Sequence, residues 1–217
     1  MPQIRLAIIG SAGRKEPVTH DHWQLMLTQT AATIAGLEAS GQQVTALVSG
    51  GAAGADHVAV RLFLRAPQRL ALNLELAAAW DFTNNVYVES DSGNWQTNPG
   101  RTLNRHLLNF QNTAFLEPFE DLGAALQHHN CQWRVHQSGL LERNNFVADA
   151  DVVFAMTFGI GRQIAQGGTA DTCRKYQARG GQQIYHLDLN TGIVHPSAIV
   201  PAQRKMQAQA KQESLWP

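Results

Sequence analysis

Cysteine is scarce in this sequence, and charge of neither sign is in excess. Only two cysteines occur, Cys131 and Cys173, far apart in the chain. So low a number argues against a disulfide framework and is typical of a reducing compartment. Lysine plus arginine and aspartate plus glutamate each total 17, so the net charge is zero with the histidines neutral. Proteins that hold nucleic acid mainly through phosphate contacts carry a basic excess, and we therefore expect no nucleic-acid partner.

Long apolar segments are absent as well. No apolar run approaches the roughly 20 residues that a membrane-spanning helix needs, so we expect no membrane association. A strand is predicted to begin within the first few residues, which leaves no room for the basic and apolar regions of a signal peptide. We therefore expect a cytoplasmic protein. Its 217 residues are enough for one well-buried core.

Strands and helices are predicted to alternate along most of the chain. Continuous apolar runs indicate the strands, and apolar residues at helical spacing indicate the helices. The predicted strands are residues 4–9, 44–48, 70–74, 151–155 and 183–187. The predicted helices start after Thr19 or Asp21, near Gly54, near 140 and at the N-cap Thr169, and end at 40–41, 67, 148 and 179. Such alternation predicts an α/β fold, a Rossmann-like open parallel sheet with helices on both faces.

Residues from about 76 to 139 interrupt this alternation. The segment is rich in aromatic residues, among them Trp80, Tyr87 and Trp95. It is too long to be a plain connection in a compact domain, so we predict an aromatic-rich insertion or lid with elements of its own. Two short helices are expected in it, at 103–110 and 122–128. Its rings either stack on a base or pack the insertion onto the core.

The framework is predicted to form a single Rossmann-like nucleotide-binding domain over residues 1–200, followed by a C-terminal tail at 201–217. Three glycine-rich loops in it each connect a predicted strand to a helix. The carboxyl ends of parallel strands meet at one edge of an open sheet, where the ligand crevice lies. Glycines let a ligand approach backbone amides closely, and the start of a helix attracts anions. The loops therefore predict a phosphate or pyrophosphate site.

The first two loops follow the strands 4–9 and 44–48. Arg14 closes the first loop, where its guanidinium either binds a phosphate bidentately or is simply solvated. Asp56 would repel a phosphate, so it either accepts hydrogen bonds from ribose hydroxyls or stabilises the first turn of its helix; we favour the second role. The candidate ligand-binding residues of these loops are Gly10, Ser11, Gly13, Arg14, Ser49, Gly50, Gly51, Gly54 and Asp56.

The third loop follows the strand 151–155 and ends in a Gly-Gly pair. That pair favours ligand binding over the alternative, a helix cap that needs no ligand. Polar residues on the helix before the strand are candidates too, although a surface ion pair is the alternative there. The candidates from this helix and loop are Arg143, Asn144, Thr157, Gly167, Gly168, Thr169, Asp171 and Thr172.

A cluster of possible metal ligands lies near the end of the insertion. His128, His129, Cys131 and His136 fall within nine residues. Their spacing matches no structural zinc pattern. We therefore expect no metal and no cofactor, and a nucleotide-type small molecule as the ligand.

Taken together, these motifs resemble the SLOG superfamily. They are Gly-Ser-Ala-Gly-Arg at 10–14, Ser-Gly-Gly-Ala-Ala-Gly-Ala-Asp at 49–56, Arg143-Asn144, and Gly-Gly-Thr at 167–169. The superfamily comprises Rossmann-like proteins and is named for the DNA-processing protein DprA (Smf) and the LOG phosphoribohydrolases. The similarity covers about residues 3–75 and 140–190. It implies a nucleotide or nucleotide-derived ligand, such as a nucleoside monophosphate or an ADP-ribose-like molecule, and a possible homodimer.

The resemblance also implies an alternative function. LOG enzymes hydrolyse the N-glycosidic bond of a nucleoside 5′-monophosphate with an arginine and with a glutamate that follows a Pro-Gly-Gly-x-Gly-Thr motif. Arg143 matches the arginine, whereas the later motif lacks the proline and carries Asp171, one methylene shorter, in place of the glutamate. Arg143 and Asp171 would then be catalytic. Single-strand nucleic-acid binding of the DprA kind is a third hypothesis, which the neutral charge disfavours.

Overall fold

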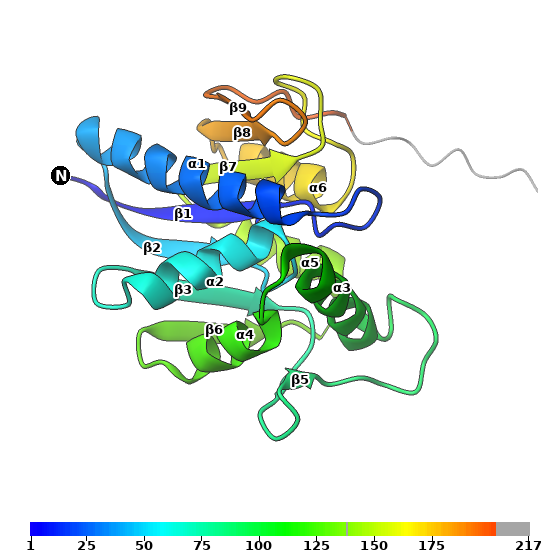
Figure 1. Cartoon of the computed structure of the whole chain (residues 1–217). Helices are drawn as coiled ribbons and strands as arrows, with labels where there is room; N and C mark the ends of the chain where they lie inside the picture. The colour runs from blue at the N-terminus through cyan, green and yellow to red at the C-terminus, as the bar shows by residue number, and fades with distance from the viewer. Residues whose placement is uncertain (138, 203–217) are drawn as a thin grey trace, which may run out of the picture.

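A seven-stranded sheet forms the centre of the protein (Figure 1). The computed structural model describes residues 1–137 and 139–202. The strand order is β6-β3-β2-β1-β7-β8-β9, and every neighbouring pair is parallel except β8 and β9. The strands are β1 (Gln3–Gly10), β2 (Gln43–Ser49), β3 (Ala71–Leu76), β6 (Cys131–Val135), β7 (Val152–Thr157), β8 (Ile184–Asp188) and β9 (Ile193–His195). The predicted Rossmann-like α/β fold is thereby confirmed.

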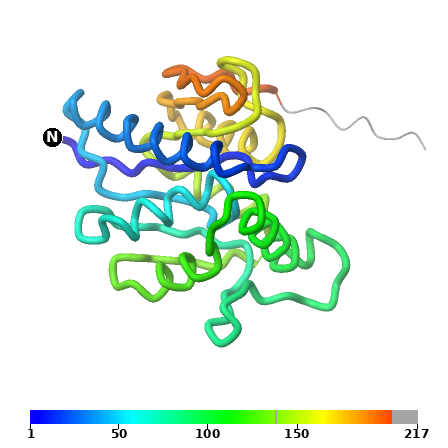
Figure 2. The backbone as a smooth tube through the Cα atoms, in the orientation of Figure 1, coloured from blue at the N-terminus to red at the C-terminus, as the bar shows by residue number. Residues whose placement is uncertain are grey.

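Helices cover both faces of the sheet (Figures 1 and 2). On one face lie α1 (His20–Ala39), α2 (Ala55–Arg65) and α4 (Pro118–Gln127), whose buried side chains form one apolar cluster with the sheet. On the other face lie α5 (Leu140–Val147) and α6 (Gly168–Ala178), which share a second cluster. The remaining helix, α3 (Pro99–Ala114), lies beside the carboxyl ends of the strands, at the right of Figure 1.

The start of α1 follows from its sequence. Thr19 is the N-cap, its hydroxyl accepts the amide of His22, and the His22 ring closes a capping box. Such a cap satisfies amides that the first helical turn leaves free. Apolar residues at helical spacing then face the sheet, and Ser40 ends the helix as predicted.

The segment predicted as an insertion is partly integral to the sheet. Its final part supplies the edge strand β6, which pairs with β3, and α4, which packs on α2. The small hairpin β4 (Trp80–Asp81) and β5 (Val86–Tyr87) precedes α3. The predicted helix at 103–110 is confirmed within α3, and the one predicted at 122–128 is confirmed in α4, which ends one residue earlier, at Gln127. Sequence reasoning missed β6 because its three central residues are exposed and give no apolar run.

Two of the aromatic rings of this segment pack in the core. Trp80 and Tyr87 are buried and meet edge to face, with ring centroids 5.0 Å apart. Trp95, by contrast, is 48% exposed. Trp80 and Tyr87 therefore pack the segment onto the core, and their rings are not exposed for stacking on a base.

The strand order places a switch point between β1 and β7. The chain moves outward from β1 through β2 and β3 on one side, and from β7 through β8 on the other. In open α/β sheets the ligand crevice lies at the carboxyl ends of the strands that flank such a point. The glycine-rich loops after β1, β2 and β7 all leave this edge (Figure 2). No helix in residues 1–137 and 139–202 is long and apolar enough to cross a membrane, and tail residues 203–217 lie outside the described part.

Candidate functional site

The first loop passes tightly between β7 and the start of α2. The Ser11 amide donates to the Met156 carbonyl at 2.8 Å, and the Ser11 carbonyl accepts the Ala55 amide at 3.0 Å. A Cβ atom on Gly10 would lie 2.0 Å from the Met156 oxygen, so only glycine fits there. Gly10 is thus needed for packing, and Arg14, further along the loop, extends to the exposed surface.

The second loop is buried along its whole length. The Gly51 carbonyl accepts the Tyr87 hydroxyl at 2.7 Å, and the Ser49 hydroxyl donates to the Asp56 carbonyl at 2.9 Å. Gly54, with φ +67°, lies against Ser11 so closely that a Cβ atom would meet the Ser11 oxygen at 2.2 Å. Neighbouring groups of the protein therefore cover the residues that the sequence assigned to an anion cradle.

An internal carboxylate already lies at the amides of the second loop. Asp56 is 6% exposed, and its Oδ2 accepts the Ala52 amide at 3.4 Å. Burial raises the pKa of Asp56, while the Arg143 charge and the backbone amides of the loop oppose that rise. Asp56 therefore stabilises the loop before α2; the role that we favoured, stabilisation of the first turn of its own helix, stays a prediction.

Arg143 reaches from α5 across the second loop. Its Nη1 donates to the Gly50 carbonyl at 2.6 Å, and its Nη2 lies 3.8 Å from the Asp56 carboxylate. A Cβ atom on Gly50 would fall 2.4 Å from the guanidinium carbon, so the arginine needs a glycine beneath it. The side chain is only 11% exposed. Arg143 is thus a buried partner of Asp56.

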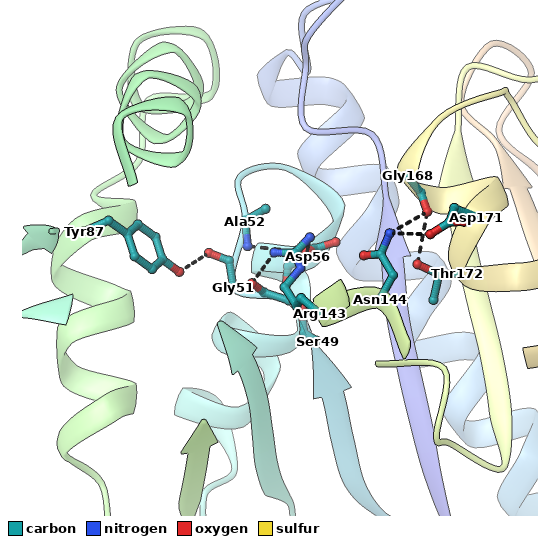
Figure 3. A network of polar contacts seen from close by, with 11 residues as sticks. Ser49, Gly51, Ala52, Asp56, Tyr87, Arg143, Asn144, Gly168, Asp171 and Thr172 are labelled. Carbon is teal, nitrogen blue, oxygen red and sulfur yellow. Dashed lines mark hydrogen bonds and ion pairs between the residues drawn. The ribbon is translucent and has the colours of Figure 1, made fainter. Parts of the chain in front are cut away.

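The next residue, Asn144, binds the third loop. Its Nδ2 donates to the Asp171 carboxylate at 3.0 Å and to the Gly168 carbonyl at 3.4 Å. Figure 3 shows the two neighbouring α5 side chains pointing to opposite sides, Arg143 toward Asp56 and Asn144 toward α6. Consecutive residues of one short helix therefore connect two of the three loops.

The start of α6 is open, and its predicted cap is wrong. Gly167, not Thr169, is the N-cap, because α6 begins at Gly168 and Thr169 is already its second residue. The φ of Gly167 is +137°, a conformation that favours glycine. No side chain of the described residues caps this end. Both glycines are exposed, and a Cβ atom on Gly167 would meet nothing within 4 Å. Among the three loops, this one offers helix-start amides to solvent.

Groups of α6 itself neutralise the acid in its first turn. Asp171 pairs with Lys175 Nζ at 2.8 Å and lies 3.9 Å from Arg174 Nη2, besides accepting from Asn144. The Thr172 hydroxyl is buried and donates to the Gly168 carbonyl at 3.0 Å. Asp171 therefore holds α5 and α6 together beside the open helix start.

Thr157 and His186 hold the loop that leads to Gly167. The His186 Nδ1 bonds the Gly161 carbonyl at 2.8 Å, and since a carbonyl only accepts, Nδ1 carries the proton. Nε2, 2.8 Å from the Thr157 hydroxyl, then accepts from it, and that oxygen accepts the Ala165 amide at 3.1 Å. His186 was not among the residues that the sequence predicted for the site. The feature that could have indicated it is a histidine within an otherwise apolar strand.

We expect His186 to make the stability of the protein depend on pH. The side chain is fully buried, and burial lowers its pKa, although the hydrogen bond to the Gly161 carbonyl and the charge of Asp188 partly oppose the shift. Because the unfolded chain then binds a proton more readily, the stabilisation is complete above about pH 6.5 and is lost as the pH falls, by up to about 1.4 kcal/mol per pH unit. Urea unfolding between pH 5 and 8 measures this loss. His186→Gln should remove that component and exposed His129→Gln should keep it; equal profiles for all three proteins would contradict the prediction.

The possible zinc ligands do not gather. Within residues 1–137 and 139–202 no group of three or more His, Cys, Asp or Glu side chains is placed to hold a metal ion. His128 and His129 stack on each other, with ring centroids 4.4 Å apart. His136 instead pairs with Glu75 on β3, its Nε2 2.5 Å from the carboxylate.

The fold and the loops together define a Rossmann-like α/β protein with glycine-rich loops at its switch point. No protein-family model matches the chain. The chain is 33% identical over 181 residues to the uncharacterized protein R261 of Acanthamoeba polyphaga mimivirus, and the match covers 81% of this chain and 92% of the viral protein. The chain therefore belongs to the same family as this viral protein.

Proposed function

We propose that the protein binds a nucleotide or nucleotide-derived ligand, a nucleoside monophosphate or an ADP-ribose-like molecule, at the start of α6. The observation that carries this proposal is the open helix start itself, with its exposed Gly167–Gly168 pair next to the switch point. Free amides and the positive end of the helix dipole favour a phosphate group. SLOG membership, expected from the motifs, remains part of the proposal.

The surroundings of the helix start suit an anion. Lys175 and Asn144 neutralise and bind the Asp171 carboxylate, so that its charge is less repulsive to a phosphate. The Asp56–Arg143 pair holds the second loop, and Asn144, the next residue on α5, holds the start of α6, so the site is organised before a ligand arrives.

Comparison of AMP with adenosine tests the proposal. A ligand at 100 times its Kd stabilises a protein by about 2.7 kcal/mol, so AMP or ADP-ribose should raise the melting temperature by several degrees. Adenosine, which lacks the phosphate, should raise it much less. Nucleotide binding would be refuted if AMP, ADP-ribose and the other nucleoside monophosphates all left the melting temperature unchanged and titration calorimetry detected no heat of binding.

A nucleotide N-glycosidase of the LOG type is the second candidate. It is supported by the place of Asp171, in the first turn of α6 and joined through Asn144 to the helix of Arg143. A carboxylate there would stabilise a cationic sugar as the glycosidic bond breaks. Release of free base from a nucleoside monophosphate, lost in Asp171→Asn, would support this reaction. A folded protein that binds AMP without releasing adenine would leave binding as the function.

Two further expectations from the sequence remain proposals. A homodimer is proposed on the resemblance alone, and sedimentation of the purified full chain would measure the oligomeric state. A cytoplasmic location is proposed on the low cysteine content. Fractionation of the native cell would test it.

A further inference from the structure

The central sheet ends on one side in a strand whose outer edge is open. β6 is the last strand of the sheet and lies below β3 in Figure 1. Among residues 1–137 and 139–202, no strand pairs with its outer edge. Proteins usually protect such edges with very short strands, with proline or with charges that point inward. β6 has five residues, no proline and a single charge, whereas the opposite edge strand, β9, has three residues.

Every second residue of β6 turns its backbone groups outward. Just before the strand, the Asn130 carbonyl accepts the Leu72 amide at 3.1 Å. Just after it, the His136 amide donates to the Leu76 carbonyl at 2.8 Å. The even-numbered residues therefore bond to β3, because alternate residues of a parallel strand bond to the same neighbour. The amide and the carbonyl of Trp133, at the centre of β6, then point away from β3, where no group of the described residues bonds them.

An exposed pair of aromatic rings lies beside this edge. Trp133 is the neighbour of Leu74 on β3, on the face of the sheet where α4 packs, and is still 39% exposed. Its ring lies 6.2 Å from that of Phe82 in the small hairpin, centroid to centroid, and Phe82 is 47% exposed. Tryptophan and phenylalanine are enriched where proteins contact one another. The edge therefore combines free backbone groups with an apolar surface.

A second β6 fits this edge when it runs antiparallel and the two Trp133 residues lie opposite each other. These residues then exchange both N–H···O bonds, as in the hydrogen-bonded pair of an antiparallel ladder. Cys131 of each copy lies opposite the partner's Val135, so that one face of the junction is apolar. On the other face, Arg134 lies opposite the partner's Gln132, and no like charges meet directly. β6 is therefore complementary to itself, as a two-fold interface requires.

The polar residues near this edge carry balanced charge. A cavity of about 180 Å³ on the polar face is lined by Arg5 and Arg134 and by the acidic residues Glu75 and Asp149. Glu75 is also the β3 neighbour of Arg134, so that guanidinium has a carboxylate beside it within the sheet. With equal numbers of each sign, two such faces do not repel each other. The charge pattern therefore favours a second copy over a strongly acidic or basic partner.

We propose that two copies of this chain associate through β6, which pairs antiparallel with the partner's β6 and joins the two sheets into one. Pairing satisfies the outward backbone groups of β6 and buries the exposed part of Trp133. The homodimer expected from the resemblance thereby gains an interface that a separate observation supports. The interface does not depend on nucleotide binding, because β6 contributes no residue to the start of α6, and the two proposals are tested separately.

Cysteine cross-linking of the full chain tests the register. Val135→Cys places a thiol opposite the partner's Cys131, at the Cα separation of about 5.5 Å that a disulfide spans. Within one copy the two positions are roughly 13 Å apart along the strand, so they bond only between copies. Oxidation with copper phenanthroline should convert most of this variant into a covalent dimer on a non-reducing gel. Arg134→Cys, whose thiol lies opposite the partner's Gln132, and the wild type are the controls and should remain mostly uncross-linked.

Sedimentation of the full chain measures the association itself. The wild type should sediment with twice the mass of one chain at micromolar concentration. Trp133→Lys places like charges opposite each other and removes the central aromatic contact, so it should weaken the dimer by about tenfold or more. Trp95→Lys changes a tryptophan that is 48% exposed and lies outside β6, and it should leave the association unchanged.

The outcomes separate the interface from the proposed function. A wild type that sediments as a monomer, or a dimer that persists in Trp133→Lys, overturns the interface, and nucleotide binding then stands or falls by its own test. Cross-linking of Arg134→Cys as fast as that of Val135→Cys also overturns the pairing. If Trp133→Lys does not fold, the cross-linking rates of the two cysteine variants decide.

Discussion

The Arg143→Met variant is expected to lose about 3–5 kcal/mol of unfolding free energy, because it leaves the buried Asp56 carboxylate without its cationic partner. Methionine keeps the apolar stem of the side chain and removes the charge. The Asp56 carboxylate lies among loop amides with 6% exposure, so water cannot replace the guanidinium. The lost hydrogen bond to the Gly50 carbonyl adds to the cost.

The pH dependence of this loss has a defined sign. Burial already raises the pKa of Asp56, and removal of Arg143 takes away the largest influence that lowers it. A carboxyl group whose pKa is raised on folding stabilises the native state at low pH and loses that contribution as the pH rises. The deficit of Arg143→Met should therefore be smaller at pH 5 than at pH 8 in urea unfolding.

Two matched variants control for trivial loss of packing. Asp56→Asn combined with Arg143→Met removes both charges and should recover most of the lost free energy. Arg5→Met removes an exposed arginine that pairs with Asp149 at 3.3 Å, and should cost about 1 kcal/mol or less. If Arg143→Met costs no more than Arg5→Met, the buried pair does not stabilise the second loop.

Thr169→Glu is expected to raise the stability of the free protein and to abolish nucleotide binding. Thr169 is the second residue of α6, so a glutamate there interacts favourably with the helix dipole, by about 0.3–1 kcal/mol. The same charge repels a phosphate from the helix start. At a ligand concentration of 100 Kd, the stabilisation of about 2.7 kcal/mol that AMP gives the wild type should vanish.

The Thr169→Glu variant is decisive because its expected effects on stability and on nucleotide binding have opposite signs. A scaffolding role for Thr169 would change stability and binding in the same direction, whereas an anion site changes them in opposite directions. Thr169→Gln has the shape of glutamate without the charge and should retain most AMP binding. Thermal melts of the three proteins, with and without AMP, give both quantities; unchanged AMP stabilisation in Thr169→Glu would move the site away from α6.

Continuous runs of apolar residues made most of the fold predictable from the sequence. The runs that become β1, β2 and β7 are buried strands flanked by helices, and their order along the chain predicts a parallel sheet. The edge strand β6 was not predicted, because its central residues are exposed and it forms a strand only through its pairing with β3. Such pairing is a tertiary contact, which local sequence does not contain.

The candidate site was predictable in its position and not in its internal contacts. The glycines marked the three loops correctly, but the sequence assigned the second-loop amides to a ligand, where the structure has Asp56. Nothing in the sequence pairs Arg143 with Gly50, 93 residues away. The same holds for Tyr87 and His186, since each bonds a loop that is distant in sequence. The cap at Gly167 depends on a backbone angle, which residue type alone suggests only weakly.

The short α5 helix sets a constraint on length. Its adjacent residues Arg143 and Asn144 must point to different loops, and a single inserted or deleted residue before them would rotate both by about 100°. Either change would break both attachments together, even though no chemical group was lost. Proteins with this arrangement should therefore tolerate substitutions on the outer surface of α5 far better than the insertion or deletion of a residue between Gly139 and Arg143.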